Sequence, residues 1–244
     1  LLKEQAEGRS VSIVYSPLDA LKLAQENPDQ QIVFVGVGFE TTTPLVAMAI
    51  KRAKALGLKN FSVFVAHKNM PGALETIVSD PSLRIDALIL PGHVSTIIGM
   101  KPYEFLAKKY GIPGVITGFE AVDVLQGVAM IMRQLHEGRA EIEIAYTRGV
   151  APEGNQVAVA AINEVFHTVD ATWRGLGVIP GSGYAIRPEF AEFDAFQRFE
   201  PAVEPTQEPK GCRCGDVLRG MMAPNECPLF RKVCTPENPV GPCM

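Results

Sequence analysis

The order of apolar runs along the first 180 residues constrains the fold more than any other feature of the sequence. Runs of strand length occupy residues 11–15, 31–37, 61–66, 85–90, 114–117, 142–146 and 172–179. Segments with helical character separate them, at residues 18–26, 44–56, 72–78, 102–110, 122–136 and 155–166. Apolar strands that alternate with helices are typical of parallel sheets covered by helices. The sequence therefore predicts the α/β fold class.

Two stretches of the sequence repeat the same order of elements. Residues 35–40 read VGVGFE, and residues 115–120 read VITGFE. Each stretch leads from a predicted strand into a predicted helix, which ends at a glycine and is followed by another strand. This echo predicts two similar α/β lobes and a third, loop-rich region. The predicted divisions are residues 1–60 (a partial first lobe), 61–187 (the second lobe) and 188–244 (the C-terminal region, which also looks incomplete).

Composition indicates a globular protein with a substantial core, because 47% of the 244 residues are hydrophobic and 20% are charged. A net charge of −4 gives no electrostatic reason to expect nucleic acid or a membrane as partner. The apolar runs are too short to span a bilayer, and no signal peptide is recognisable. We therefore expect a cytoplasmic location. The chain begins without Met and stops one residue after a cysteine, so we expect it to be part of a longer protein.

All the cysteines lie within residues 211–244, which we call the cysteine segment. They are Cys212, Cys214, Cys227, Cys234 and Cys243. The segment is rich in Gly and Pro and has no helical or strand period, so it cannot bury enough apolar surface to order itself. Clustered cysteines in a cytoplasmic protein more often bind metal than form structural disulfides. The cysteine segment is therefore predicted to bind a metal centre through its thiolates.

The cysteine spacing favours one kind of metal centre without excluding the others. The paired C-x2-C hooks of zinc ribbons are absent. Iron–sulfur clusters tolerate irregular spacing, and a Cys-Pro pair such as Cys227-Pro228 occurs in ferredoxin-type runs. Five cysteines exceed the four that a four-iron cluster needs, which leaves at least one for a free or redox-active thiol. A structural zinc site and cysteines that are idle or cross-linked remain alternatives.

A threonine-rich turn follows the strand at residues 31–37. Its sequence, GFETTTP, spans residues 38–44, and Thr43 is expected to cap the next helix with Pro44 in the first helical position. Glu40, Thr41 and Thr42 then lie at the carboxyl end of the strand, the edge where α/β sheets bind ligands. They are candidate site residues. The alternative is a helix cap surrounded by polar residues that face solvent.

A second candidate motif, PGHVSTIIG at residues 91–99, follows the strand at residues 85–90. It places His93 and Ser95 at the carboxyl end of a strand in the second lobe. A single histidine is more often structural, but a position facing the threonine-rich turn favours function. The sequence HKN at residues 67–69 is a weaker candidate of the same kind, and residues 181–183 are expected to form a turn. No nucleotide-binding glycine motif is present.

Three motifs together resemble the HypD family of hydrogenase maturation factors. They are GVGFETTTP, LPGHVSTIIG and the cysteine pattern GCRCGDVLRGMMAPNECPLF followed by CTPENPVGPCM. The resemblance implies two Rossmann-like lobes and a region that carries a four-iron four-sulfur cluster. It implies a role in building the iron centre of nickel–iron hydrogenases, which carries two cyanide ligands and one carbon monoxide. A scaffold of this kind is an accessory factor rather than a free-standing turnover enzyme.

The same resemblance implies partners and roles for individual residues. The partners are a HypC-type chaperone, which shares the bound iron, and a HypE-type protein, which donates cyanide. Five residues are expected to line the cleft that receives iron or its ligands: Glu40, Thr41, Thr42, His93 and Ser95. Family members carry further cysteines in an N-terminal part that precedes Leu1 and in a continuation that follows Met244, so the cluster's ligand set stays open.

Two other classes of function remain as alternatives. One is a thiol–disulfide oxidoreductase, in which a cluster beside Cys212 and Cys214 passes electrons to a disulfide substrate. The other is an α/β protein that binds a small molecule and carries a structural zinc site.

Overall fold

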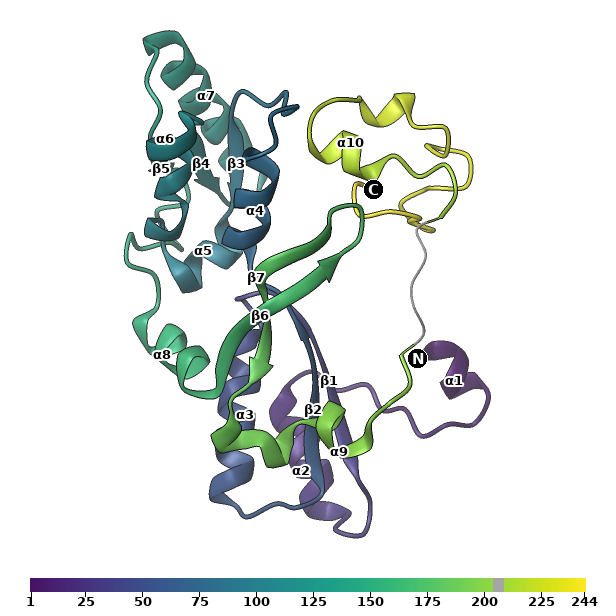
Figure 1. Ribbon diagram of the computed structural model, residues 1–244. Helices are drawn as coiled ribbons and strands as arrows, with labels where there is room; N and C mark the ends of the chain where they lie inside the picture. Colours follow the sequence, from purple (N-terminus) through teal and green to yellow (C-terminus); the bar gives the residue numbers. More distant parts are fainter. Residues whose placement is uncertain (204–208) are drawn as a thin grey trace.

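The computed structural model describes residues 1–203 and 209–244 and has the mixed α/β fold predicted from the sequence (Figure 1). Two of its sheets are parallel: a two-stranded sheet in the order β1-β2 and a three-stranded sheet in the order β3-β4-β5. A third sheet, β6-β7, is an antiparallel hairpin. Figure 1 shows one α/β lobe below, a second above, and the hairpin running between them.

The first lobe is built on the parallel pair β1 (Ile32–Gly38) and β2 (Phe61–His67), connected by α3 (Thr43–Ala55). Helix α2 (Pro17–Glu26) is capped by Ser16, whose Oγ accepts the N–H of Leu18 and whose own N–H donates to the Asp19 carboxylate. Helix α8 (Gln156–Val165) packs against α3 although it is far away in the sequence. These helices bury their apolar faces in one core with the inward-facing residues of the sheet.

The second lobe is built on β3 (Leu88–Pro91), β4 (Gly114–Thr117) and β5 (Ile142–Ile144). Its helical elements are α4 (Met70–Val78), α5 (Gly92–Ile98), the 3-10 turn η1 (Lys101–Tyr103), α6 (Glu104–Tyr110) and α7 (Ala121–Glu137). The β4-α7-β5 unit repeats the order of β1-α3-β2, so the two GFE sequences occupy equivalent turns. The repeated sequence pattern therefore corresponds to two parallel β-α-β units.

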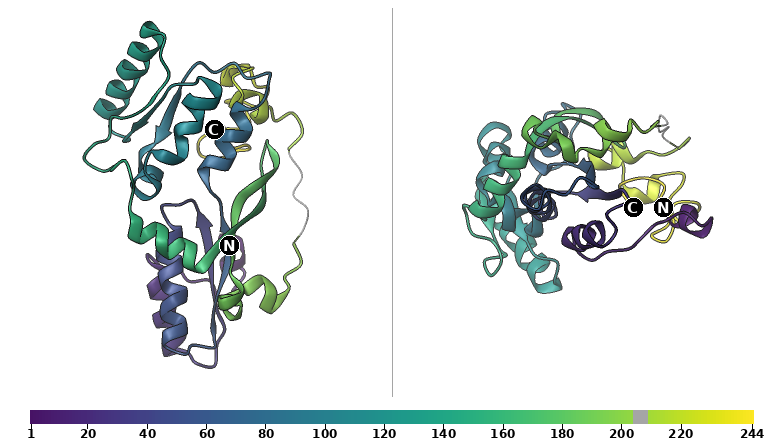
Figure 2. Two further views of the ribbon diagram at one scale, coloured as in Figure 1. Left: turned by 60° about the vertical axis from the view of Figure 1, so that its left-hand side comes forward. Right: turned by 90° about the horizontal axis from the view of Figure 1, so that it is seen from below.

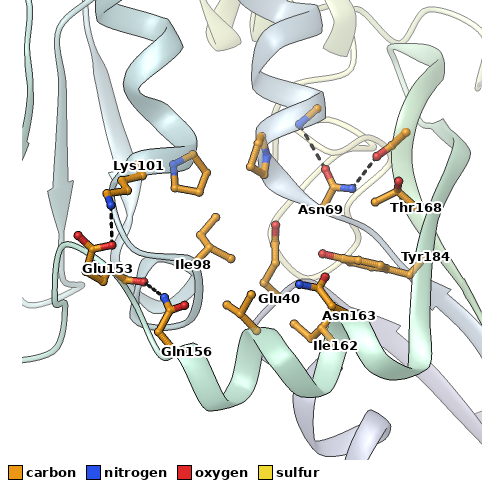
Figure 3. A pocket seen from close by; sticks show the side chains of 15 residues that line it. Glu40, Asn69, Ile98, Lys101, Glu153, Gln156, Ile162, Asn163, Thr168 and Tyr184 are labelled. Atoms are coloured by element: carbon orange, nitrogen blue, oxygen red, sulfur yellow. Dashed lines mark hydrogen bonds and ion pairs between the residues drawn. The ribbon is translucent and has the colours of Figure 1, made fainter.

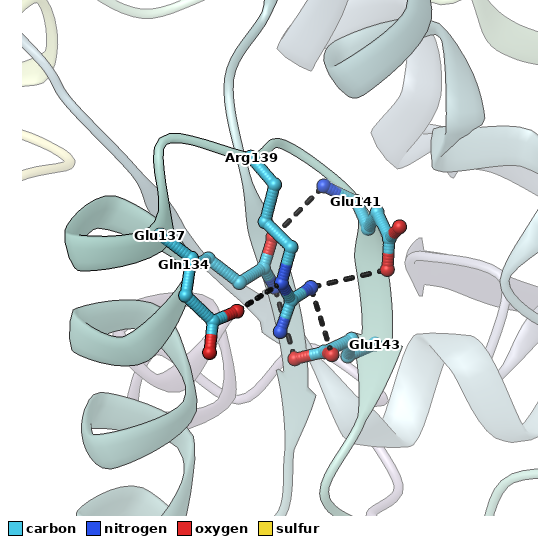
Figure 4. Close-up of polar contacts among 5 residues, drawn as sticks. All are labelled: Gln134, Glu137, Arg139, Glu141 and Glu143. Atoms are coloured by element: carbon cyan, nitrogen blue, oxygen red, sulfur yellow. Dashed lines mark hydrogen bonds and ion pairs between the residues drawn. The ribbon is translucent and has the colours of Figure 1, made fainter.

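The turn from α7 into β5 is fixed by the polar network in Figure 4. Arg139 forms ion pairs with Glu137 at 2.6 Å and with Glu141 and Glu143, both at 3.1 Å. The fully buried Gln134 donates to Glu143 and accepts the N–H of Glu141 at 2.8 Å. Exposed ion pairs contribute little alone. The satisfied, buried Gln134 amide is therefore the main anchor of this turn.

The hairpin was not expected from the sequence. Helix α8 ends at Val165 and leads directly into β6 (Phe166–Trp173), which pairs with β7 (Gly177–Ile186). The single strand predicted at residues 172–179 is therefore wrong, because the chain reverses direction inside that range. Residues 181–183 lie within β7 rather than in a turn.

In the described residues of the C-terminal region, namely 188–203 and 209–244, the helices are short. They are η2 (Pro188–Phe193), α9 (Ala195–Phe199), α10 (Cys214–Leu218) and η3 (Pro224–Glu226). The helix expected over residues 189–199 is interrupted at Asp194, whose carboxylate caps α9 by accepting the N–H of Phe196 at 2.9 Å. At the other end of the chain, α1 (Leu2–Ala6) is a single short helix.

Residues 11–15 do not form the predicted strand. They have no regular structure, and Ile13 and Tyr15 are 73% and 100% exposed. Strand propensity alone does not order a segment, and these residues pair with no strand in the described parts of the chain. The N-terminal stretch therefore adds nothing to the sheet of the first lobe.

The hydrophobic cores cross the divisions predicted after residues 60 and 187. Phe61 and Val63 share a core with Ile50, and the same core contains Phe190 and Phe193. The second core gathers residues between Leu74 and Val150. We therefore describe the lobes by their cores, and the three residue ranges stay predictions. Among the described residues, no helix combines the length and apolar character needed to cross a membrane.

Candidate functional site

A cavity of about 590 Å³ lies between the two lobes, and Glu40 projects into it from the turn after β1 (Figure 3). Glu40 is only 1% exposed. Its Oε1 accepts the backbone N–H of Met70 at 3.0 Å, whereas its Oε2 is buried and has no hydrogen-bond partner in the described residues. A buried oxygen without a hydrogen-bond partner is typical of a site that a ligand, water or ion completes. Glu40 is therefore the predicted site residue with the clearest opportunity to bind one.

Burial controls the charge of Glu40. It raises the pKa of this carboxyl to about 7, although the backbone N–H groups of Glu40 and Met70 offset part of the effect. Burial also raises the pKa of Tyr184 in the cavity wall, and the charge of Glu40 adds to this shift. Near neutral pH, Glu40 is therefore poised between a carboxylate that accepts hydrogen bonds and a carboxylic acid that can donate one.

The wall opposite the charged rim of the cavity is organised by Asn69. Its Oδ1 caps α4 by accepting the N–H of Gly72 at 3.3 Å, and its Nδ2 donates to the carbonyl of Gly181 at 2.7 Å. Asn69 thus joins α4 of the second lobe to β7 of the hairpin. On the other side, Lys101 and Glu153 form an ion pair of 2.7 Å at the rim. The sequence HKN at residues 67–69, a weaker candidate in the sequence, therefore contributes a residue to this cavity.

The threonines of the turn stabilise its backbone. The Oγ1 atoms of Thr42 and Thr43 both donate to the carbonyl of Phe39, at 3.2 and 2.7 Å. Thr43 is the first residue of α3 and Thr42 is its N-cap residue, so the expected cap at Thr43 is displaced by one position. Thr41 is half-buried and Thr42 is exposed. Neither Thr41 nor Thr42 lines the cavity that contains Glu40.

The two second-lobe candidates have different surroundings, and neither lines the cavity that contains Glu40. His93 is exposed and packs on Phe119, with ring centroids 4.6 Å apart. Ser95 is fully buried and donates to the carbonyl of Pro91 at 2.8 Å, with Tyr103 OH at 3.5 Å. His93 is therefore accessible to a ligand or partner, whereas Ser95 supports the start of α5 from inside the lobe.

The two equivalent GFE turns have different environments. Glu40 is buried in the cavity, whereas the Glu120 side chain is 78% exposed and pairs with Arg148 at 3.2 Å. Arg148 also forms a two-bond pair with Asp123, at 2.6 and 2.7 Å. Sequence similarity alone does not reveal this difference, because the environment of each glutamate depends on elements far away in the chain.

His67 is a buried titratable residue at the end of β2. It is 2% exposed, and neither ring nitrogen has a hydrogen-bond partner among the described residues. The ring fits beside Gly36, where a Cβ would approach His67 Cε1 to 2.7 Å. Burial lowers the pKa of His67 to about 4, so the ring is neutral at physiological pH. No periodicity in the sequence distinguishes this histidine from the others.

Thiols gather in the cysteine segment. Sγ of Cys214 lies 2.9 Å from Sγ of Cys243, and both Cys212 and Cys214 approach Gly241 so closely that a Cβ there would overlap their sulfurs. Burial is the main cause that raises the pKa of the Cys212 and Cys214 thiols. Cys234 is also buried, and its sulfur accepts the N–H of Val240, the residue before Gly241, at 3.3 Å. Gly241 therefore creates the space in which three thiols meet.

These thiols fit an iron–sulfur or zinc centre by donor chemistry. The distance of 2.9 Å between the sulfurs of Cys214 and Cys243 matches neither kind of pair. In a disulfide the sulfurs are about 2 Å apart, and two thiolates on one tetrahedral ion are about 3.8 Å apart. Across the described residues, no group of three or more His, Cys, Asp or Glu side chains is arranged to hold a metal ion. Binding of one metal ion by both Cys214 and Cys243 would thus require their thiols to separate.

These elements define a class: an α/β protein with two parallel sheets, a polar cavity between its lobes, and a C-terminal segment that collects thiols. The sequence matches the HypD family, described as "Hydrogenase formation hypA family", over residues 1–244. The chain belongs to this family.

Several named proteins are similar to the whole chain. It is 49% identical to "Hydrogenase expression/formation protein HupD" of Azotobacter chroococcum mcd 1. It is 48% and 46% identical to proteins named "Hydrogenase maturation factor HypD" from Azotobacter vinelandii and Cupriavidus necator. Each alignment covers 100% of this chain and 66% of the relative. The chain thus spans about two thirds of the length of these proteins.

Proposed function

We propose that this chain is part of a scaffold that assembles the iron centre of nickel–iron hydrogenases, on which iron receives its cyanide and carbon monoxide ligands. The observation that carries the proposal is the family match over residues 1–244, together with 46–48% identity to proteins named hydrogenase maturation factor HypD. In this role the protein holds its substrate for partner proteins and does not turn over a free metabolite.

The proposed ligand-handling surface combines the cavity with the exposed strand ends beside it. Glu40 supplies a buried oxygen without a partner among the described residues, which can accept or donate a hydrogen bond near neutral pH. His93 supplies an accessible imidazole, Thr42 stabilises the turn that carries Glu40, and Thr41 is a half-buried residue of the same turn. Ser95 acts indirectly, by holding the first turn of α5 that carries His93.

The cysteine segment is proposed to hold a four-iron four-sulfur cluster. Cys212, Cys214 and Cys243 are the proposed core of the ligand set because they share the space at Gly241. Cys227 is a further candidate, since backbone N–H groups and Arg213 lower the pKa of its thiol and favour the thiolate. When bound, the cluster would supply electrons. Cys234 is the remaining candidate, since its sulfur accepts the N–H of Val240, the residue before Gly241.

The proposed partners are a HypC-type chaperone, which would share the iron, and a HypE-type cyanide donor. Exposed aromatic and apolar residues near His93 support a docking role for this face. Phe119 and Val122 are 72% and 73% exposed at the turn that packs on His93. Exposed large apolar side chains that lie together are typical of protein-binding surfaces.

The test replaces His93 or Thr42 by Ala in the complete protein and measures hydrogenase activity in cells whose own gene has been deleted. We expect both variants to block maturation, because one loses the imidazole and the other a support of the turn. Val157→Ala is the matched control, since Val157 is 80% exposed on α8 and belongs to neither motif. Normal hydrogenase activity in both H93A and T42A would contradict the proposed ligand-handling surface.

A thiol–disulfide oxidoreductase is the second candidate. The contact of 2.9 Å between Sγ of Cys214 and Sγ of Cys243 favours it, because these thiols need little movement to form a disulfide. Anaerobic purification followed by metal analysis separates the candidates. Iron with sulfide, together with co-purification of the HypC-type chaperone, supports the scaffold. Zinc without iron would exclude a cluster in either role.

A further inference from the structure

The β6-β7 hairpin connects the lobes to the cysteine segment, as Figures 1 and 2 show from several directions. At its tip, Gly175 packs on α10: the Cβ of Cys214 lies 3.4 Å from the position a Cβ would take on Gly175. A Cβ on Gly215 would in turn approach the carbonyl oxygen of Gly175 to 2.7 Å. Next to it, Arg174 donates to the carbonyl of Val240 at 3.1 Å. The hairpin tip thus contacts α10, which begins at Cys214, and also Val240, which precedes Gly241.

The cysteine segment also contacts the second lobe directly. Arg219, which follows α10, forms an ion pair of 2.8 Å with Asp80, and its carbonyl accepts the N–H of Arg84. This second contact leads to the loop before β3. The hairpin contact leads from the thiols toward Trp173, which packs on Phe39, the residue before Glu40.

The connection to that turn runs through Trp173, the single tryptophan of the chain. Its ring packs on Phe39, with centroids 5.9 Å apart, and Lys68 Nζ lies 5.2 Å from the ring centroid on another side. The indole N–H donates to Ser182 Oγ at 2.8 Å, and the fully buried Ser182 donates to the carbonyl of Ile179. The ring is therefore held by three different kinds of contact.

Phe39 in turn is tied to the start of α3. Its carbonyl accepts bonds from Thr42 and Thr43, and the next residue, Glu40, is the buried acid of the cavity. A displacement of Trp173 would move Phe39 and hence this turn. The path from Cys214 to Phe39 is short. Gly175 contacts Cys214, and Trp173, two residues before Gly175 in the chain, contacts Phe39.

We propose that Trp173 is a positioning residue that holds the cysteine segment in register with the Glu40 turn, by clamping the hairpin between Phe39, Lys68 and Ser182. Movement of the cysteine segment then reaches the Glu40 turn through the hairpin, and movement of the turn reaches the thiols by the same path. The coupling needs no particular metal, so it does not rest on the proposed function.

The forward test measures hydrogen–deuterium exchange of the whole chain in W173A, W173F and V178A. We expect W173A to accelerate exchange about two- to tenfold, both in residues 38–45 and in residues 211–220, the size expected from losing an aromatic pair. W173F keeps a ring against Phe39 and should restore most of the protection. Val178 lies on the same hairpin and is 65% exposed, so V178A should change neither segment.

The reverse test perturbs the cysteine segment and observes the tryptophan. In G215A the new Cβ would press on the Gly175 carbonyl, and we expect a shift in Trp173 fluorescence together with faster exchange in residues 38–45. K232A, at an exposed residue of the same segment, should leave both unchanged. F39L supplies a second route if W173A fails to fold, because it removes the ring contact from the other side. Unchanged exchange of residues 211–220 in W173A or F39L would overturn the proposal.

Discussion

The backbone N–H of Met70 donates to Glu40 Oε1 at 3.0 Å, and this bond joins the turn after β1 to the first residue of α4. Met70 packs against the core of the second lobe, whereas Glu40 follows the first strand of the first lobe. A single buried carboxyl therefore links the two lobes through Oε1, whereas its Oε2 has no hydrogen-bond partner in the described residues. The protonation of Glu40 affects both the stability of the fold and the chemistry of the cavity.

Glu40 should make the free energy of unfolding fall as the pH rises. Its folded pKa of about 7 lies above the unfolded value of 4.5, so its stabilising effect is complete below pH 4.5 and is lost as the pH rises through 7. E40Q stays neutral and keeps an oxygen for Met70. At pH 8 it should be more stable than the wild type by about 2–3 kcal/mol. Denaturant unfolding at pH 5 and 8 checks this, and an equal difference at both pH values would contradict it.

His67 should have the opposite pH dependence. Its folded pKa of about 4 lies below the unfolded value of 6.5, so its stabilising effect is complete above pH 6.5 and is lost as the pH falls through 4. A His67→Gln variant does not titrate and should lose less stability than the wild type between pH 7 and pH 4. Thermal unfolding across this range measures the difference, with exposed His136→Gln as the control.

Asn69 should contribute more to stability than an ordinary helix cap. N69A loses both the cap of α4 and the bond to Gly181, and should cost about 2 kcal/mol, the sum of about 1 for each. N155A loses the cap of α8, a bond of 3.0 Å on an exposed helix end, and should cost about 1 kcal/mol. Denaturant unfolding of both variants tests the comparison. Equal losses would show that the Gly181 bond has no net effect.

Gly241 should be required for the thiols to meet. A Cβ in G241A would overlap the sulfurs of Cys214 and Cys212, so this variant should bind less iron after anaerobic reconstitution. P239A, at an exposed neighbouring residue, is the control and should bind as much iron as the wild type. Iron and sulfide analysis per chain measures the effect. Full iron content in G241A would mean that metal binding does not use this space.

Much of the fold can be predicted from local patterns. The strands at β1, β2, β4 and β5, and helices such as α2 and α3, follow apolar periodicity and capping signals within a few residues of each element. The hairpin was missed because Gly177 to Ile186 is rich in glycine and lacks strand alternation. Residues 11–15 were wrongly assigned because propensity does not supply a partner strand. In both cases the outcome depends on whether a partner strand is present.

The sequence by itself determined the fold class, the repeated β-α-β units, the family and the segment that holds all the thiols, because these depend on local periodicity and on motifs that are read directly. Only the tertiary structure decided that Glu40 is buried, that Ser95 supports a helix from inside the lobe, and that Trp173 stands between the cysteine segment and the Glu40 turn. Burial, pKa shifts and ring contacts arise from residues far apart in the chain, so they exist only once the lobes and the hairpin have packed together.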